Sequence, residues 1–174
     1  MKAPACPGAI EHFAVSLHVA IRVCREEDLP VMEWFGLFTP HREIIQSTFE
    51  SQERGDMVML VAESNGYPIA QVWINLADKR SEGIGILWAI RVFPWLQNLG
   101  IGKHLLLAGE TVLRERGYSC VELGVEEDNP DARRFYERYG YQVVGRETGE
   151  YSYQTPDGTL RTVPTDQWIM RKPL

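Results

Sequence analysis

The sequence predicts a single domain of the α/β (α+β) class, built on a mixed sheet. Apolar, strand-like runs alternate with amphipathic helical segments in the order β-α-α-β-β-β-α-β-α-β-β, which gives about seven strands and about four helices. With 174 residues, of which 44% are hydrophobic, the chain can form one substantial core. Because no linker, repeat or low-complexity tract divides it, we place a flexible tail at residues 1–17 and the domain at residues 18–174.

The first half of the chain is expected to form a strand, two helices and a hairpin. The run VAIRVC (19–24) is typical of a short strand, and the acidic residues that follow it predict a helix within REEDLPVMEWFGLF (25–38). HREIIQSTFESQERG (41–55) has one apolar face and ends in glycine, as an amphipathic helix does. The strands MVMLVAES and PIAQVWINLA are joined by Asn65-Gly66, which favours a tight hairpin turn.

In the second half, GIGILWAIRVF (83–93) is almost continuously apolar, which indicates a central strand buried on both faces. A helical stripe from Gly102 to Arg116 follows it, then the strand SCVELGV. NPDARRFYERYG (129–140) has an asparagine cap, a proline at the first helical position and a final glycine. YQVVGRE, a turn at Pro156-Asp157-Gly158 and DQWIMRKPL close the chain with strands.

Composition excludes several classes of protein. A net charge of -6 and a pI near 5.3 argue against nucleic acid or an anionic membrane as the main partner. Three scattered cysteines and four scattered histidines predict neither a disulfide framework nor a metal site. Since we find no secretory signal and no apolar run of roughly 20 residues, we expect a cytoplasmic protein.

A glycine turn, Gln97-Asn98-Leu99-Gly100-Ile101-Gly102, joins the buried strand to its helix. Glycines let the backbone approach a ligand, and the unpaired N–H groups of a helix N-terminus attract anions. A plain structural turn is an equally good reading of two glycines alone. A P-loop is excluded because His104 follows Lys103 where Ser or Thr is needed, and Leu105 replaces the third glycine of a dinucleotide fingerprint.

Two segments, IRVFPWLQNLGIGKHLL (90–106) and VELGVEEDNPDARRFYERYGY (121–141), together resemble the GNAT superfamily of acyl-CoA-dependent N-acyltransferases. The resemblance has three parts: a hydrophobic strand, Gln-x-x-Gly-x-Gly opening a helix, and the pattern LxV…DN…A…FYxxxGY. It implies one domain with a mostly antiparallel, twisted sheet of about seven strands flanked by about four helices. It also implies acetyl-CoA as acyl donor and a small-molecule or peptide amine as acceptor. Terminal strands could pair across a two-fold axis in a homodimer.

The resemblance implies a cofactor site in which main-chain groups bind the pantetheine arm and the pyrophosphate, and Asn129 hydrogen-bonds pantetheine. Asn129 can also act simply as a helix cap, and both roles can hold together. The side chains of Lys103, His104 and Arg133 could contact phosphates or could simply be solvated. The predicted cofactor-binding residues are Ile90, Arg91, Val92, Gln97, Asn98, Leu99, Gly100, Ile101, Gly102, Lys103 and Asn129.

For the chemistry, the resemblance implies Tyr136 as the general acid that protonates the departing thiolate, since a phenol is protonated at neutral pH. A backbone N–H near Val92 would meet the oxyanion. Relatives often carry a glutamate in the fourth strand, but residues 86–90 here contain no carboxylate. We therefore name Glu82 as the candidate base, with Glu122 or Glu126 acting through water as alternatives; a reaction without a base remains open.

The acceptor pocket is expected between the first and second strands. Its candidate residues are Glu33, Trp34, Phe35, Phe38, His41, Tyr151 and Tyr153. Aromatic rings beside a carboxylate would suit an amine with apolar bulk, although the rings could equally serve only to cover the sheet. Two other functions stay open: a non-catalytic module that binds acyl-CoA, which the missing strand carboxylate would suit, and a protein that binds no CoA.

Overall fold

The computed structural model describes residues 13–155 and 158–174, the side chains of Tyr151 and Gln154 excepted. Within this part the chain forms three α-helices and one seven-stranded sheet, with short 3-10 turns between them. The helices are α1 (Arg42–Glu53), α2 (Ile101–Glu115) and α3 (Pro130–Arg138). The strands are β1 (Ala20–Val23), β2 (Met57–Ser64), β3 (Tyr67–Asn75), β4 (Ile84–Val92), β5 (Cys120–Glu126), β6 (Gln142–Gln154) and β7 (Leu160–Pro173).

The sheet has the order β1-β2-β3-β4-β5-β7-β6, and its only parallel pair among the described strands is β4 with β5. This arrangement confirms the predicted fold class, a mixed and mostly antiparallel sheet flanked by helices. The parallel pair follows from the chain itself, because the α2 crossover returns β5 to the same direction as β4.

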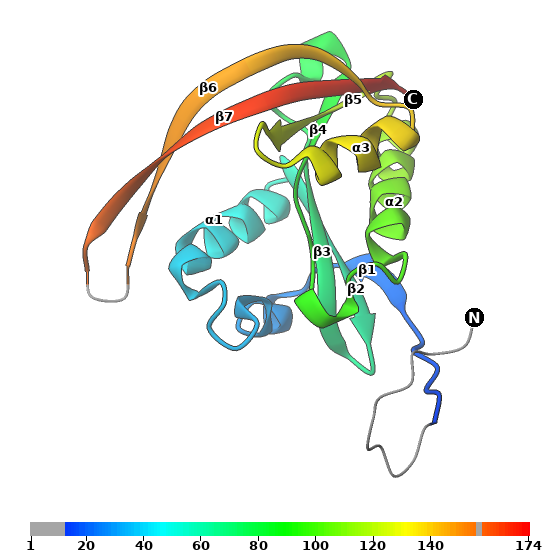
Figure 1. The fold of residues 1–174 in the computed structure, drawn as a ribbon, viewed down its shortest axis with the longest axis vertical. Helices are drawn as coiled ribbons and strands as arrows, with labels where there is room; N and C mark the ends of the chain where they lie inside the picture. The colour runs from blue at the N-terminus through cyan, green and yellow to red at the C-terminus, as the bar shows by residue number, and fades with distance from the viewer. Residues whose placement is uncertain (1–12, 156–157) are drawn as a thin grey trace.

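The helices cover the two faces of the sheet separately: α1 lies on one face, and α2 and α3 lie on the other (Figure 1). Behind α2, Leu105, Leu106 and Leu113 are buried against Ile74 and Leu87 of the sheet. The smaller core behind α1 joins the helix to strands β2 and β3; its buried members include Ile45, Phe49, Met59 and Trp73. Strand β4 therefore faces a core on each side of the sheet, which explains its almost continuously apolar sequence, as predicted.

The close approach of α2 to the sheet depends on Gly85 of β4. A Cβ atom built on this glycine would lie 2.1 Å from Leu113 Cδ2, much closer than real carbon atoms approach. Any side chain at this position would push the helix away from the strand. The glycine is therefore a packing requirement of the β4–α2 unit, distinct from the glycines of the turn that joins them.

The helix predicted within residues 25–38 is absent. The segment instead forms two 3-10 turns, Glu26–Asp28 and Val31–Glu33, and then Trp34, Phe35 and Gly36 adopt positive φ angles of 44°, 57° and 93°. Pro30 would break a continuous helix. The Trp34 ring is buried and its Nε1 donates a hydrogen bond of 3.1 Å to Pro68 O, so a tertiary contact offsets the strained backbone.

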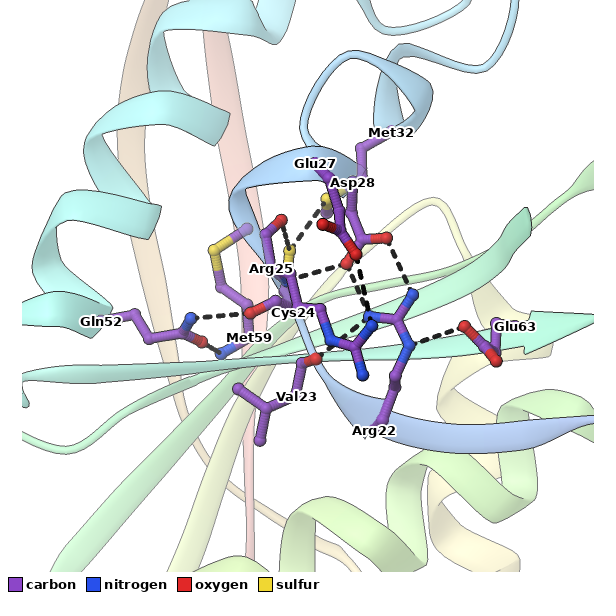
Figure 2. A network of polar contacts seen from close by, with 10 residues as sticks. All are labelled: Arg22, Val23, Cys24, Arg25, Glu27, Asp28, Met32, Gln52, Met59 and Glu63. Carbon is purple, nitrogen blue, oxygen red and sulfur yellow. Dashed lines mark hydrogen bonds and ion pairs between the residues drawn. The ribbon is translucent and has the colours of Figure 1, made fainter. Parts of the chain in front are cut away.

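A polar network ties β1 to the turn that follows it (Figure 2). Arg22 donates to both oxygens of Asp28, at 2.6 and 2.8 Å, and to Glu63 Oε2 of β2 at 2.6 Å. Nearby, Gln52 of α1 donates to Cys24 O at 3.0 Å and accepts from Met59 N at 2.8 Å. These bonds satisfy buried polar groups where the sheet edge, the turn and α1 meet.

The two terminal strands form a long hairpin that arches past the body of the sheet toward the side of α1 (Figure 1). They extend well beyond the strands predicted from YQVVGRE and DQWIMRKPL. Of the turn predicted at Pro156-Asp157-Gly158, the first two residues lie outside the described part, and Gly158 has a φ of 83°.

The predicted tail over residues 1–17 lies mostly outside the described part, and residues 13–19 form neither helix nor strand. None of the helices in residues 13–155 and 158–174 has the length and apolar character that crossing a membrane requires. In the same residues no group of three or more His, Cys, Asp or Glu side chains could hold a metal ion.

Candidate active site

Strands β4 and β5 separate half-way along their length. Their parallel pairing runs from Ile84↔Cys120 to Leu87↔Leu123. Beyond this point β4 continues along β3, while β5 continues along β7 as far as Glu126↔Gln167. The split leaves one edge of β4 without a neighbouring strand in the described structure, so its backbone groups there can bind an extended ligand.

A cavity of about 210 Å³ occupies this split. Its walls come from the diverging ends of both strands, from the start of α3 and from β7. The lining residues are Leu87, Trp88, Ala89, Ile90, Leu123, Gly124, Val125, Glu126, Asn129, Ala132, Tyr136 and Gln167. Three of the residues predicted from the sequence thus meet at one cavity: Ile90 of β4, Asn129 at the start of α3 and Tyr136 within α3.

A β-bulge in β4 opens the split. Gln71 of β3 is opposite Arg91 and Trp73 is opposite Trp88, so two residue steps along β3 face three steps along β4. Ala89 absorbs the extra residue with a φ of 50°, a conformation that residues other than glycine rarely adopt. Because of the bulge, the side chains of Trp88 and Arg91 lie on the same face of the sheet, where a regular strand would place them on opposite faces.

Tyr136 lies on α3 with its ring largely buried against neighbouring aromatic rings. Its ring centroid is 5.1 Å from that of Phe135 and 5.7 Å from that of Tyr141, in edge-to-face contacts. Burial raises the pKa of the Tyr136 phenol to about 12. At neutral pH the hydroxyl of this cavity-lining residue is therefore protonated, as a general acid must be before it reacts.

Asn129 caps α3, since its Oδ1 accepts a hydrogen bond of 3.1 Å from Ala132 N. Pro130 at the first helical position completes the cap that the sequence predicted. The cap holds Asn129 at the mouth of the cavity, so the structural role places the residue where a ligand-binding role would also require it.

The glycine turn brings the N-terminus of α2 close to the end of β4. Gly100 has a φ of 86° and precedes the helix, while Asn98 has a φ of 63°. No side chain caps α2, and the first helical bond of the described backbone here is His104 N to Gly100 O at 3.3 Å. The N–H groups of Ile101, Gly102 and Lys103 thus have no partner within the helix, which suits them to an anion.

The remaining cofactor predictions fall along the same turn. The side chains of Asn98, Leu99 and Lys103 are exposed. Gln97 folds back and donates from Nε2 to Val92 O at 3.2 Å, which ties the turn to the strand. Arg91 and Val92 pair with Gln71 and Ala70 of β3. Their backbone groups on the β3 side are engaged, and the Arg91 side chain points to the α1 face of the sheet.

The structure does not bring Glu82 to the cavity. Glu82 ends a 3-10 turn before β4 and is exposed, whereas the cavity begins at Leu87, further along the strand. Glu126 does line the cavity and accepts a hydrogen bond of 2.5 Å from Gln167 Nε2. The sequence placed Glu82 just before the strand but could not show at which end the strands separate.

Glu122 is a structural carboxylate. It is buried between Lys79 and Arg171, whose Nη2 lies 2.6 Å from Glu122 Oε2. Burial alone would raise the pKa of Glu122, but the hydrogen bonds from Lys79 and Arg171 outweigh it and lower the pKa below its ordinary value. A carboxylate held by two cations is a poor proton acceptor.

The candidate acceptor residues gather on the α1 side of the split. Trp34, Phe38 and His41 form a chain of ring contacts, with centroids 5.3 Å and 5.9 Å apart, and His41 meets Tyr153 of the terminal hairpin at 5.9 Å. Phe35 is 85% exposed and stacks on Tyr67 at the rim. The side chain of Tyr151 lies outside the described part, and Glu33 is engaged by Arg42 and Thr39.

The sequence did not predict a role for the side chains of four residues on this side: Gln71, Trp73, Trp88 and Arg91. The only signal in the sequence is that polar and indole side chains interrupt two strands that are otherwise apolar. Their meeting on one face depends on the bulge at Ala89, which no local pattern announces.

Comparisons with known proteins agree with this architecture. Residues 24–141 match the family model described as "Acetyltransferase (GNAT) family". A mycothiol acetyltransferase of Thermomonospora curvata is 35% identical over 98 residues, which cover 56% of this chain and 31% of that protein. The chain thus spans about a third of the length of this relative. An uncharacterized N-acetyltransferase of Bacillus subtilis is 30% identical over 61% of this chain and 79% of its own length.

Solved structures extend the similarity to the fold. The ribosomal-protein-S18-alanine N-acetyltransferase of Escherichia coli superposes with a TM-score of 0.67 at 23% identity, over 90% of this chain and 94% of that one. An N-acetyltransferase of Thermoplasma acidophilum, in complex with coenzyme A, superposes with a TM-score of 0.62 at 20% identity, over 90% and 99% of the two chains.

Proposed function

The chain belongs to the GNAT family of acetyltransferases, and from that premise we propose that it transfers an acetyl group from acetyl-CoA to a primary amine of a small molecule or peptide, with Tyr136 as general acid. The observation that carries the proposal is a protonated tyrosine with a pKa of about 12 in the wall of the β4/β5 split, in the same cavity as the unpaired edge of β4.

The residues of the split fit an acyl-CoA donor. The unpaired edge of β4 near Ile90 can hydrogen-bond an amide-containing arm, as a further strand would. Of the predicted N–H groups from Gln97 to Lys103, those of Ile101, Gly102 and Lys103 can hold the pyrophosphate at the positive end of the α2 dipole, whereas Gln97 N already donates to Pro94 O at 3.4 Å. Asn129 stands at the mouth of the cavity and adds an amide to the same ligand.

When bound, acetyl-CoA would supply the thioester that the amine attacks. The Tyr136 hydroxyl gives its proton to the departing sulfur, and the resulting tyrosinate takes up the proton that the new amide nitrogen loses. A pKa of about 12 keeps the Tyr136 hydroxyl protonated before the transfer, and it makes the tyrosinate a base strong enough to take up the proton afterwards. A backbone N–H near Val92 would stabilise the oxyanion.

The missing carboxylate in β4 favours a second candidate, a module that binds acyl-CoA without turnover. Neither Glu82 nor Glu122 supplies a base at the cavity, and Glu126 is the one acidic residue among the cavity-lining residues described.

A homodimer and a cytoplasmic location stay predictions from the sequence. Sedimentation of the full chain would test the homodimer.

The test compares CoA release by the parent protein and by Tyr136→Phe over a panel of amines. We expect kcat to fall at least about 100-fold, because the phenol supplies the proton for the leaving group, while the affinity for acetyl-CoA is kept. Tyr139→Phe is the matched control: Tyr139 packs on Phe135 at 5.0 Å and does not line the cavity, so its loss should leave kcat within about threefold.

A Tyr136→Phe protein as fast as the parent across pH would show that Tyr136 is not the acid. Tight binding of acetyl-CoA with no CoA release for any amine would instead favour the non-catalytic module. Calorimetry that shows no heat with acetyl-CoA would exclude both.

A further inference from the structure

Tyr141, three residues past the end of α3, is the first fully buried residue that follows the helix. Every residue of α3 is exposed or half-buried, whereas Tyr141 is only 2% exposed. Its backbone N–H donates to Tyr136 O at 3.2 Å, so Tyr141 is bonded to the last turn of the helix. Because α3 buries no side chain completely, its position depends strongly on this buried neighbour.

The hydroxyl of Tyr141 joins α3 to α2, whose ribbon lies beside the end of α3 (Figure 1). It donates a hydrogen bond of 3.1 Å to Glu110 Oε1, and Glu110 is 0% exposed. Lys172 of β7 donates to the two carboxylate oxygens at 2.9 and 2.8 Å, and Arg114 donates to Oε2 at 3.0 Å. The acceptor of the Tyr141 bond is thus held by both α2 and β7.

Glu110 does not need the Tyr141 hydroxyl to be satisfied. Both oxygens of the carboxylate keep Lys172 as a partner without it, and Lys172 and Arg114 balance the buried charge. A phenylalanine of nearly the same volume would also fill the space that the Tyr141 ring occupies. The hydrogen bond is therefore an additional constraint on where the ring lies, beyond what packing and charge balance require.

The Tyr141 ring in turn contacts the ring of Tyr136. The two meet edge-to-face with centroids 5.7 Å apart, and Phe135 meets Tyr136 at 5.1 Å. Lys172 Nζ lies 5.6 Å from the centroid of the Tyr141 ring and restrains it further. Aromatic pairs in this arrangement are attractive and directional, so a movement of the Tyr141 ring would shift Tyr136 at the cavity wall.

The Tyr141 hydroxyl remains a hydrogen-bond donor at neutral pH. Burial, and then the charge of Glu110 and the hydrogen bond to it, raise the pKa of Tyr141 well above its ordinary value, although Arg114 opposes the shift. The hydroxyl therefore donates to the carboxylate throughout the pH range in which the Tyr136 phenol is protonated.

We propose that Tyr141 is a positioning residue for Tyr136: the hydrogen bond from its hydroxyl to Glu110 fixes the ring on which Tyr136 packs, and so holds the Tyr136 hydroxyl at the β4/β5 split. The kinetic consequence of this role rests on the proposed acetyl transfer. A general acid must lie within about 2.6–3.2 Å of the atom that it protonates, and a misplacement of about 1 Å can cost about 100-fold in rate. Loss of the bond should therefore slow the transfer and leave the cofactor-binding groups untouched.

The kinetic test removes the hydroxyl of Tyr141 and keeps its ring. In Tyr141→Phe we expect kcat for CoA release to fall about 10-fold, with KM for acetyl-CoA within about twofold of the parent value, because only the position of the acid changes. Arg114→Met is the matched control. It takes a partner from the same buried carboxylate and leaves the Tyr141 bond in place, so kcat should stay within about twofold of the parent value.

Two kinetic results would contradict the positioning role. The first is a comparable fall in kcat in Tyr141→Phe and Arg114→Met, which would show that any loss at Glu110 slows the protein. The second is a parent-like kcat in Tyr141→Phe when Tyr136→Phe itself is slow, which would overturn the role and leave the proposed transfer intact.

A double-mutant cycle tests whether Tyr141 acts through Tyr136. In the Tyr136→Phe background, Tyr141→Phe should lower kcat by less than about twofold, because the acid that it positions is already absent. A further fall of about 10-fold in that background would show that Tyr141 supports the fold in general, and would overturn the positioning role.

Hydrogen exchange of the α3 backbone amides, measured on the full chain, does not depend on turnover. We expect exchange to be at least about threefold faster in Tyr141→Phe, since a bond to a charged group is lost, and within about twofold of the parent in Arg114→Met. Faster exchange in Tyr141→Phe would support the positioning role even if no amine released CoA or Tyr136→Phe were as fast as the parent, results that count against the proposed transfer or its acid. Unchanged exchange would overturn the positioning role, whatever the turnover.

Discussion

A single row of residues across the sheet ends in an arginine at each side, and the two arginines have different surroundings. Arg22 of β1 is opposite Val61, Val61 is opposite Gln71, and Gln71 is opposite Arg91 of β4. All four side chains face α1. Three strand spacings separate the ends by about 14 Å.

At the β1 end the polar groups satisfy one another (Figure 2). Arg22 hydrogen-bonds two carboxylates, and Asp28 also accepts from Arg25 N at 2.8 Å. The hydrogen bonds that Arg22 donates to Asp28 and Glu63 raise the pKa of the guanidinium, although burial opposes the shift. Such a network stabilises the fold and leaves little for a ligand to bind.

At the β4 end, Arg91 lies against the faces of Phe38 and Trp73, beside the unsatisfied atoms of Gln71, Trp73 and Trp88. The contrast shows that burial of an arginine does not identify its role. The two arginines differ in their neighbours: Arg22 bonds carboxylates of the same chain, whereas Arg91 lies against aromatic rings, beside Gln71 Oε1 and two indole N–H groups that have no described hydrogen-bond partner.

The largest effect on stability should come from breaking the Arg22 network at the β1 end. Arg22→Met leaves Asp28, which is 3% exposed, without its charged partner, so the free energy of unfolding should fall by about 3 kcal/mol in urea titrations. Arg25→Met, in an exposed pair with Glu27, should change it by less than about 0.5 kcal/mol. An equal loss in the two variants would show that the network does not stabilise the fold as described.

The same pair predicts how stability changes with pH. Burial alone would raise the pKa of Asp28, but the bonds from Arg22 and from Arg25 N outweigh it and lower the pKa below the ordinary 3.8. The contribution of Asp28 is therefore complete above pH 3.8 and is lost as the pH falls through its lowered value. Urea titrations should show the difference between the parent and Arg22→Met narrowing below pH 4. A difference that grows on acidification would contradict the assignment.

The smallest effect on stability should come from a substitution at the β4 end. Trp88→Phe removes an indole N–H that bonds no described group, so it deprives no partner of a hydrogen bond and should change the free energy of unfolding by less than about 1 kcal/mol. A loss above about 2 kcal/mol would indicate that Trp88 Nε1 is hydrogen-bonded in the folded protein.

Much of the fold could be predicted because its signals are local. The strands around Asn65-Gly66, the capped helix at Asn129-Pro130 and the uncapped helix after Gly100 follow from residues within a few positions of each other. The helix predicted within residues 25–38 was wrong because a tertiary contact of Trp34 with Pro68 determines the backbone there, against the helical preference of the acidic start. Glu82 lies away from the cavity, which could not be predicted because the sequence does not show where two strands separate.

By itself the sequence determined the fold class, the glycine turn beside a buried strand, and the placing of Asn129 and Tyr136 on one helix, since hydrophobic period, capping and turn chemistry act over a few residues. Only the tertiary structure decided that β4 bulges at Ala89, that β4 and β5 separate after Leu87, and that Trp88 and Arg91 share a face with Gln71 and Trp73. Those features depend on the register between strands far apart in the chain, and register is fixed by the packing of whole faces.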